Sequence, residues 1–165
     1  MHTKQTNKYN YIKMLKKNLI TLILFFTVTG CGFTPIALER NDLNINILIL
    51  DYEGDYKINS ALRAKLSVHK NNQNAELFKV LIKTKYEKKD LSKDESGNIE
   101  NYELIASTIF EVTKDETSSR VEFNEKFTME NFSDDFEEDD YEKKIKENFA
   151  DSIYDKFISY IFQIK

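Results

Sequence analysis

The chain has 165 residues, a formal net charge of −4 at pH 7 and a single cysteine. Residues 1–30 hold five of the 24 basic residues and none of the 28 acidic ones, so residues 31–165 carry a net charge of about −9. A remainder of this length forms one domain, and its acidity argues against general nucleic-acid binding, which requires a basic surface.

The N-terminal segment has the pattern of a lipoprotein signal peptide. A lysine-rich flank at residues 13–17 precedes an apolar run, Leu19–Val28, and the small residues Thr29 and Gly30 stand directly before Cys31. As a helix, ten residues span about 15 Å, half of a bilayer core of roughly 30 Å, which disfavours a transmembrane anchor. The other alternative is that Cys31 is an ordinary buried thiol. However, it is the only cysteine, so no disulfide within the chain is possible, and it directly follows Gly30 at the end of the apolar run. We therefore predict that residues 1–30 are removed and that Cys31 is acylated.

The segment after Cys31 is predicted to leave the membrane as a tether and then enter the domain. Residues 31–42 contain the only proline and show no clear period, whereas residues 43–165 show regular patterns. Leu43–Tyr52 alternates aliphatic residues on both sides, which predicts a central strand. Gly54 ends this strand, and Asp55 is placed to cap a helix over residues 56–70.

Three further strands are predicted from side chains that alternate with period two. They cover residues 78–87, 102–112 and 121–129, joined by a charged loop at 91–101 and a turn at 115–119. In the first of them, the apolar positions alternate with Lys79, Leu81, Lys83, Lys85 and Glu87. Consecutive strands on such connections favour an antiparallel meander.

The last element is predicted to be the longest helix, of about 20 residues. An acidic run, Ser133–Asp140, leads into apolar residues spaced by four, namely Tyr141, Ile145, Phe149, Ile153 and Phe157, followed by Tyr160 or Ile161. The element order is therefore β-α-β-β-β-α. We predict an α+β fold, a two-layer sandwich of about four mostly antiparallel strands with both helices on one face.

Few residues offer chemistry for catalysis. His69 is the only histidine after the signal peptide, and a lone histidine near a helix end is more often at the surface or at a cap than a general base. No cysteine–histidine cluster offers a zinc site, and no glycine-rich phosphate loop is present. The acidic segments at Asp94-Glu95 and 134–140 lack the pattern of a calcium loop and suit a solvated helix cap better. We expect no enzyme activity, no metal and no cofactor.

One group of charges has two interpretations. Four lysines share one side of the strand at 78–87 and its continuation: Lys79, Lys83, Lys85 and Lys89. The simpler interpretation is a solvated outer sheet face, since lysine on a strand also discourages edge pairing. The functional interpretation is contact with a partner or with phosphorylated lipid head groups such as those of lipopolysaccharide, which ammonium groups attract.

The start of the predicted mature chain resembles that of the LptE family of lipopolysaccharide-assembly lipoproteins. Members often begin Cys-Gly-Phe, any residue, Pro, Leu, and this chain has Cys31-Gly32-Phe33-Thr34-Pro35-Ile36. The aromatic residue and glycine that often follow are replaced by Ala37 and Leu38. The segment Asn148–Phe157 also resembles the terminal helix of the family, in which an Ala-Asp pair precedes an aliphatic and a basic position. The order of elements agrees from end to end.

The resemblance implies a non-enzymatic lipoprotein of the outer membrane, anchored through lipid on Cys31. It implies a place as a plug inside the β-barrel LptD, helping to deliver lipopolysaccharide to the cell surface. An alternative is an independent, periplasm-facing lipoprotein that binds a small ligand or the cell wall. A lipid-anchored hydrolase is a third possibility, which the missing nucleophile and base disfavour.

Overall fold

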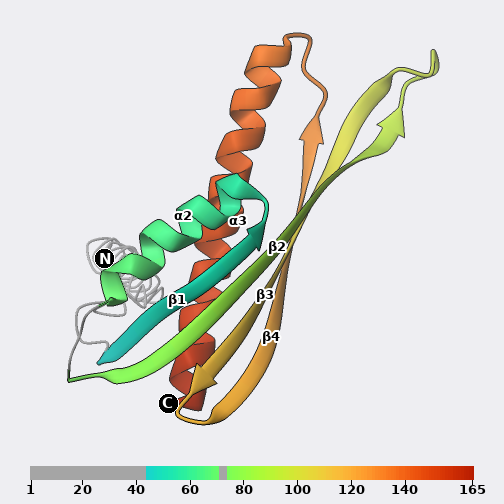
Figure 1. The fold of residues 1–165 in the computed structure, drawn as a ribbon. Coiled ribbons are helices and arrows are strands. Elements are labelled where there is room, and N and C mark those ends of the chain that lie inside the picture. The colour runs from blue at the N-terminus through green and yellow to red at the C-terminus, as the bar shows by residue number, and fades with distance from the viewer. Residues whose placement is uncertain (1–43, 71–73) are drawn as a thin grey trace, which may run out of the picture. The chain divides into compact units, whose positions relative to one another are not determined.

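The computed structural model describes residues 44–70 and 74–165 (Figure 1). Its elements follow the predicted order: β1 (Ile45–Gly54), α2 (Tyr56–Leu66), the 3₁₀ turn η2 (Ser67–His69), β2 (Glu76–Lys93), β3 (Ile99–Lys114), β4 (Thr117–Glu130) and α3 (Asp135–Ile164). The predicted signal peptide, the predicted acylation site Cys31 and the tether lie outside the described residues.

The four described strands form one sheet in the order β1-β2-β3-β4. β1 runs parallel to β2, to which α2 connects it, and the other neighbouring pairs are antiparallel. The prediction of a mostly antiparallel α+β sheet is confirmed. The prediction of a central strand at 43–52 is wrong, because β1 lies at the sheet edge with Leu50 54% exposed. Aliphatic residues on both sides of a strand suggest burial on both faces, whereas β1 buries only the side of Ile45 and Ile47.

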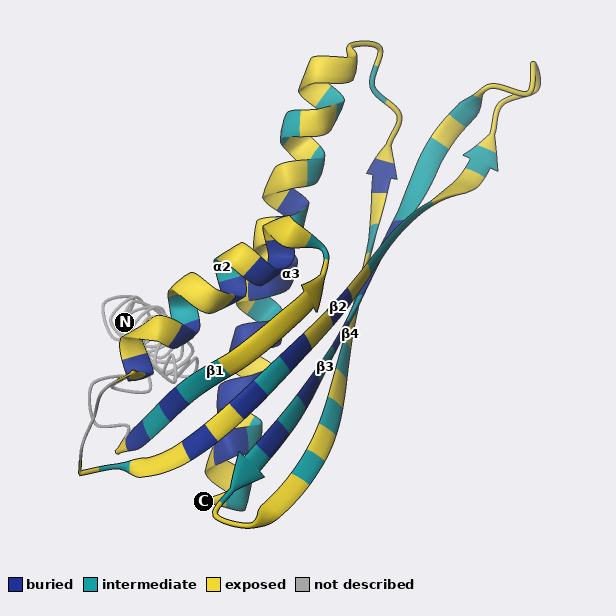
Figure 2. Ribbon diagram, in the orientation of Figure 1, coloured by how far each residue is buried: buried dark blue, intermediate teal, exposed yellow. Residues whose placement is uncertain are grey.

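The core lies between one face of the sheet and the two helices. Figure 2 shows buried residues, in dark blue, that alternate with less buried ones along β2 and β3. Alternate residues of β2 and β3 point into it, including Phe78, Val80, Ile82, Leu104, Phe110 and Val112. From α3, Phe157 is fully buried and stacks on Phe110 with ring centroids 4.0 Å apart. Phe149 is also buried, but Tyr141 is 37% exposed and packs its ring near Phe127 and Phe132. The buried stripe of α3 therefore begins at Ile145, one step later than its spacing predicts.

Several elements extend beyond their predicted bounds. The charged loop predicted at 91–101 is mostly strand, and the hairpin turns at residues 94–98, where the Asp94 carboxylate accepts hydrogen bonds from the amides of Ser96 and Asn98. Likewise, α3 has 30 residues because the acidic run forms its first turns, with Asp134 capping the amides of Phe136 and Glu137. Charged side chains are compatible with exposed strand and helix surfaces, so a drop in hydrophobicity does not mark where an element ends.

His69 differs from its expected surface position. Its side chain is buried, and its Nε2 lies 2.8 Å from the Tyr154 hydroxyl, which α3 supplies. The two rings also stack with a centroid separation of 6.2 Å. His69 therefore contributes to the contact between the end of the first helical segment and α3.

The junction of β1 and α2 requires glycine at position 54. Gly54 has a φ of +99°, and a Cβ there would lie 1.7 Å from the carbonyl oxygen of Thr84 on β2. The following residue, Asp55, donates its backbone amide to that same oxygen at 3.0 Å, and its carboxylate caps α2 by accepting from Ile58 at 2.9 Å. Below the junction, the buried Asn59 side chain accepts a hydrogen bond from the Thr84 hydroxyl at 2.8 Å.

We predict that Gly54→Ala destabilises the domain much more than Gly97→Ala. Both glycines have positive φ, so each substitution adds strain of about 1 to 2 kcal/mol. Only at Gly54 does the new methyl group also meet backbone, which adds an overpacking cost of about 1 to 3 kcal/mol or more. Thermal and urea unfolding of the purified proteins measure the difference. Equal stability of the two variants would contradict the close approach of β1 to β2.

Candidate binding face

The sheet face turned away from both helices carries the four predicted lysines. We call it the outer sheet face and define it by the outward residues of β2, β3 and β4: Lys79, Leu81, Lys83, Lys85, Glu87, Lys89, Ile105, Ser107, Ile109, Glu111, Glu122 and Lys126. None of these residues is buried, whereas their neighbours along each strand point into the core. The lysines thus share one face, as their parity predicts.

The lysines are exposed but not all unpaired. Lys83 lies 3.6 Å from the Glu111 carboxylate across the strand pair, and Lys89 lies 2.7 Å from Glu87. Lys85 pairs with the same Glu87, and Lys79 makes no ion pair with any described residue. The side chains of Lys83, Lys85 and Lys89 remain 51%, 76% and 57% exposed, so the pairs do not remove them from solvent. The face is therefore a mixed surface in which two carboxylates partly compensate the lysine stripe.

Two lysines contact the Glu87 carboxylate and lower its pKa. Hydrogen bonds from Lys85 and Lys89, followed by their positive charges, lower the pKa of Glu87 to about 2. The hydrogen bond to Glu87 and its charge in turn raise the pKa of Lys89. Because both lysines are exposed and Glu87 is partly exposed, solvent and salt screen these attractions, and a polyanion can compete with Glu87 for both lysines.

Aliphatic side chains lie between the charges on the outer sheet face. Three shallow depressions of about 410, 270 and 190 Å³ each combine at least one of the lysines with an aliphatic residue. The first joins Lys79 with Leu50 and Leu81, the second joins Lys83 and Lys85 with Ile109, and the third joins Lys85 and Lys89 with Ile105. Ile105 and Ile109 were not among the predicted contact residues, although their odd parity within the strand placed them on this face. The surface can therefore contact both charged and apolar parts of a ligand.

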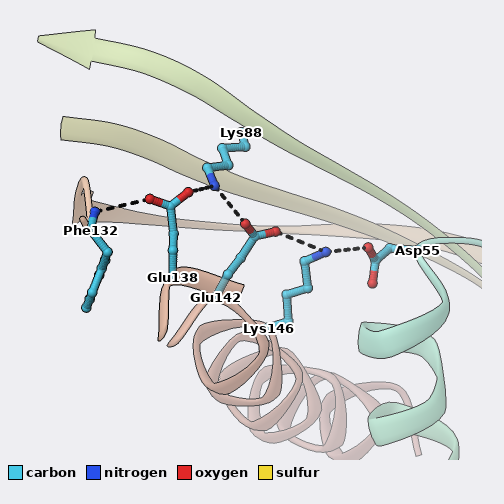
Figure 3. Close-up of polar contacts among 6 residues, drawn as sticks. All are labelled: Asp55, Lys88, Phe132, Glu138, Glu142 and Lys146. Carbon is cyan, nitrogen blue, oxygen red and sulfur yellow. Dashed lines mark hydrogen bonds and ion pairs between the residues drawn. The ribbon is translucent and has the colours of Figure 1, made fainter. Parts of the chain in front are cut away.

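A second cluster of charges lies on the helix-covered face of the sheet and joins α3 to β2 and to the start of α2 (Figure 3). Lys88 of β2 bridges Glu138 and Glu142 of α3 at 2.6 and 3.0 Å, and Lys146 bridges Glu142 and Asp55 at 3.3 and 3.1 Å. Four of the five side chains are only 15 or 16% exposed, and Lys88 is 25% exposed. The chain of charges thus joins β2, α3 and the cap of α2. We call it the charge chain.

Its members shift one another's pKa values. Burial acts to raise the pKa of Glu142 and of Glu138, but the hydrogen bonds that these carboxylates accept and the positive charge of Lys88 together outweigh burial and leave both pKa values lowered. For Lys88, burial acts to lower the pKa, and the hydrogen bonds to Glu138 and Glu142 leave it raised. The carboxylates therefore stabilise the fold above their ordinary pKa of 4.5, and that contribution is lost as pH falls through their lowered values. The contribution of Lys88 is complete below 10.5 and is lost as pH rises through its raised pKa.

Tyr86 of β2 lies beside Lys146 of the charge chain. Its hydroxyl is enclosed without a hydrogen bond of good geometry to any described group, and the Lys146 ammonium lies 3.8 Å from its ring centroid. Burial raises the pKa of Tyr86, and the neighbouring Glu142 carboxylate raises it further. The ring therefore serves as a neutral, apolar support for the ammonium group of Lys146.

Within residues 44–70 and 74–165, no three histidine, cysteine or acidic side chains gather closely enough to hold a metal ion. In the same part of the chain, no helix combines the length and the apolar composition needed to cross a membrane. Of the acidic residues considered for Ca²⁺, Asp94 forms the hairpin turn and Asp134 caps α3.

No protein-family model matches the chain, and no curated protein matches it significantly. Among solved structures, the chain is similar to rare lipoprotein B from Shewanella oneidensis, with a TM-score of 0.52 and 16% identity over 73% of this chain and 97% of that one. An uncharacterized lipoprotein B from Nitrosomonas europaea matches with a TM-score of 0.43 and 16% identity, covering 70% of this chain and 85% of that one. A putative lipoprotein from Caulobacter crescentus matches with a TM-score of 0.45 and 13% identity over 74% and 93%. The first of these likenesses shows the fold of the domain.

We predict that Lys146→Ala destabilises the domain by about 2 to 4 kcal/mol, because it leaves the largely buried carboxylates of Asp55 and Glu142 with one partner fewer. Lys143→Ala, in the same helix, removes only an exposed pair with Asp140 and should cost about 0.5 kcal/mol or less. Urea unfolding at pH 7 compares the two variants. A loss at Lys146 as small as that at Lys143 would show that the charge chain does not stabilise the fold.

Proposed function

We propose that this protein is a non-enzymatic, lipid-anchored subunit of lipopolysaccharide transport in the outer membrane, acting with a β-barrel partner of the LptD type. The observation that carries the proposal is the predicted lipid-attachment site and the sequence after it, Cys31-Gly32-Phe33-Thr34-Pro35, which resembles the mature start of LptE. A thiol at the end of a short apolar run is the site at which a lipid anchor is attached.

The fold supports this proposal. The described domain has the element order expected from the resemblance, and its fold is that of a protein named rare lipoprotein B. Both observations concern the domain, whereas the lipid anchor rests on the sequence around Cys31.

The outer sheet face supplies a surface suited to an amphiphilic, phosphorylated ligand. Lys79, Lys83, Lys85 and Lys89 offer ammonium groups for phosphates, and Leu81, Ile105 and Ile109 offer apolar contacts between them. On the helix side, many apolar residues are in the core, and the charge chain pairs Lys88 and Lys146 with acidic side chains. In this proposal the outer sheet face contacts lipopolysaccharide or the inner wall of the barrel.

The anchor and the partner can be tested together by affinity purification from detergent-solubilised envelopes. We expect mass spectrometry to show a mature chain that begins at acylated Cys31, together with a large β-barrel protein in stoichiometric amount. Cys31→Ser is the control and should lack the lipid. An unprocessed terminus or an unmodified Cys31 would contradict the anchor. A lipidated protein that purifies as a monomer would instead favour an independent lipoprotein that binds a small ligand or the cell wall.

The contact face can be tested by charge reversal. Lys83→Glu/Lys85→Glu should weaken lipopolysaccharide binding at least about tenfold at low salt, since a lysine near an anionic lipid surface contributes about 1 kcal/mol. High salt should reduce the difference. Lys143→Glu/Lys144→Glu on α3 makes the same change in net charge away from the outer sheet face and serves as the matched control. Circular dichroism checks the fold of each protein. Equal binding by the folded variants would leave these lysines as a solvated strand face.

A further inference from the structure

The segment that contains α2 differs in charge from the rest of this acidic domain. Residues 56–70 contain four basic residues and no acidic one, whereas the predicted mature chain carries a net charge of about −9. Two of the four, Lys57 and Lys65, pair with acidic side chains of α3. The other two, Arg63 and Lys70, are exposed and form no ion pair with a described carboxylate. Two positive charges on this segment are therefore available to an anion.

Both of these cations line a groove of about 460 Å³ between β1 and α2. Figure 1 shows α2 beside β1, which is the first strand of the sheet. The Arg63 guanidinium lies over the Tyr52 ring, 4.2 Å from its centroid, which holds the cation at the groove. Ser60 lines the groove as well and adds a hydroxyl group. Guanidinium, ammonium and hydroxyl groups are donors that bind phosphate, so the groove has the chemistry of a phosphate site.

Nearby carboxylates do not cancel the charge of the groove. Asp51 is the one acidic residue among the described residues that line it, and its Oδ1 accepts the backbone amide of Tyr52 at 2.8 Å. Glu53, the other acidic residue at this end of β1, lines the depression of the outer sheet face that contains Lys83 and Lys85. Two cations and one carboxylate leave the lining of the groove with a net charge of about +1.

Exposed apolar side chains lie at the same groove. Leu50 and Tyr52 line it and are 54% and 38% exposed. Tyr56 is 73% exposed, and it shares a face of α2 with Ser60 and Arg63, which follow it by four and seven residues. Aliphatic residues, tyrosines and basic residues together are typical of a surface that meets a membrane, where the tyrosine rings lie at the level of the head groups.

The chain before β1 is short enough to keep this groove near a membrane. The predicted lipid-attachment site, Cys31, precedes Ile47 of the groove lining by 16 residues, which span at most roughly 55 Å when fully extended. A tether of this length gives the groove a high effective concentration of head groups. Weak binding to a single head group is therefore enough to dock the domain on the bilayer.

We propose that the groove between β1 and α2 binds the phosphate of an anionic phospholipid between Arg63 and Lys70, with Leu50 and the exposed tyrosines at the level of the head groups. The α2 side of the domain then rests on the membrane that holds the lipid on Cys31. The nearness of the membrane rests on the anchor in the proposed function. The groove itself is separate from the outer sheet face and requires neither lipopolysaccharide nor a barrel.

The test uses the full, acylated chain in lipid nanodiscs, with a polarity-sensitive fluorophore attached through Ser60→Cys. The introduced thiol is the one that reacts, because lipid occupies the thiol of Cys31. We expect the emission to shift to shorter wavelengths in nanodiscs that contain phosphatidylglycerol, but not in nanodiscs of phosphatidylcholine alone. High salt should reduce the shift. The same fluorophore attached through Ser107→Cys, on the outer sheet face, should show no shift.

Charge reversal tests the two cations. Arg63→Glu/Lys70→Glu should lower the ratio of docked to undocked molecules at least about tenfold, since each reversal replaces an attraction to the anionic surface with a repulsion. The fluorescence lifetimes of the label measure this ratio, and circular dichroism checks the fold. Lys143→Glu/Lys144→Glu makes the same change in net charge on α3 and should leave the ratio unchanged.

Three results would overturn the proposal. They are the absence of a shift at Ser60→Cys in the anionic nanodiscs, an equal ratio for the folded Arg63→Glu/Lys70→Glu variant, and loss of docking in Lys83→Glu/Lys85→Glu, which would assign the membrane contact to the outer sheet face. A shift that free glycerol phosphate produces without phosphatidylglycerol would identify a soluble phosphate ester as the ligand and would also contradict membrane docking.

Failure of the anchor can be distinguished from failure of the groove. An unmodified Cys31 would contradict the anchor alone. A C-terminal histidine tag, bound to a nickel-chelating lipid, then holds a Cys31→Ser/Ser60→Cys chain at the same nanodiscs without acylation. The shift with phosphatidylglycerol is the expected result in that experiment too, and its absence there would count against the groove.

Discussion

Asp55 joins three elements of the domain through three different atoms. Its backbone amide donates to Thr84 of β2, one carboxylate oxygen caps α2 at Ile58, and the other accepts from Lys146 of α3 at 3.1 Å. This arrangement depends on the preceding Gly54, whose missing side chain lets the end of β1 reach the β2 backbone. From Lys146 the charge chain continues through Glu142 to Lys88, so the position of α3 along the sheet depends on the same junction.

The two faces of the sheet have different surroundings, because both helices pack on one face and leave the outer sheet face exposed to solvent. On the covered face, Phe110 and Phe157 stack on each other, and the charge chain joins β2 to α3 through Lys88 and Glu138. On the outer sheet face, lysines alternate with aliphatic residues, and their ion pairs with Glu87 and Glu111 remain exposed. Exposed pairs contribute little to folding, which leaves these side chains available for ligands at small cost to the domain. Stability and the proposed binding function are thus carried by opposite sides of one sheet.

The sequence predicted the features that depend on residues close together in the chain, and it did not predict those that depend on distant residues. The inward and outward sides of β2 followed from the alternation of Phe78, Val80 and Ile82 with lysines, and this parity placed the lysine stripe correctly. The edge position of β1 could not be predicted, because alternation of leucine and isoleucine is the same in an edge strand as in a central one. His69 was expected at the surface because a lone polar residue near a helix end gives no sign of a distant partner. Its partner Tyr154 lies 85 residues further along the chain.

The sequence by itself determined the number and order of the elements in the domain and the cap at Asp55, because each depends on residues close together in the chain. The lipid-attachment site at Cys31 stays a prediction from the sequence. Only the tertiary structure decided that Lys88 pairs with Glu138 and Glu142 in the charge chain, and that Ile105 and Ile109 lie beside the lysines. It also decided that a groove lies between β1 and α2. These features join residues that are up to 91 positions apart, as in the pair of Asp55 and Lys146. A periodic pattern specifies the side of an element on which a residue lies, but the partner that it meets there depends on how the elements pack.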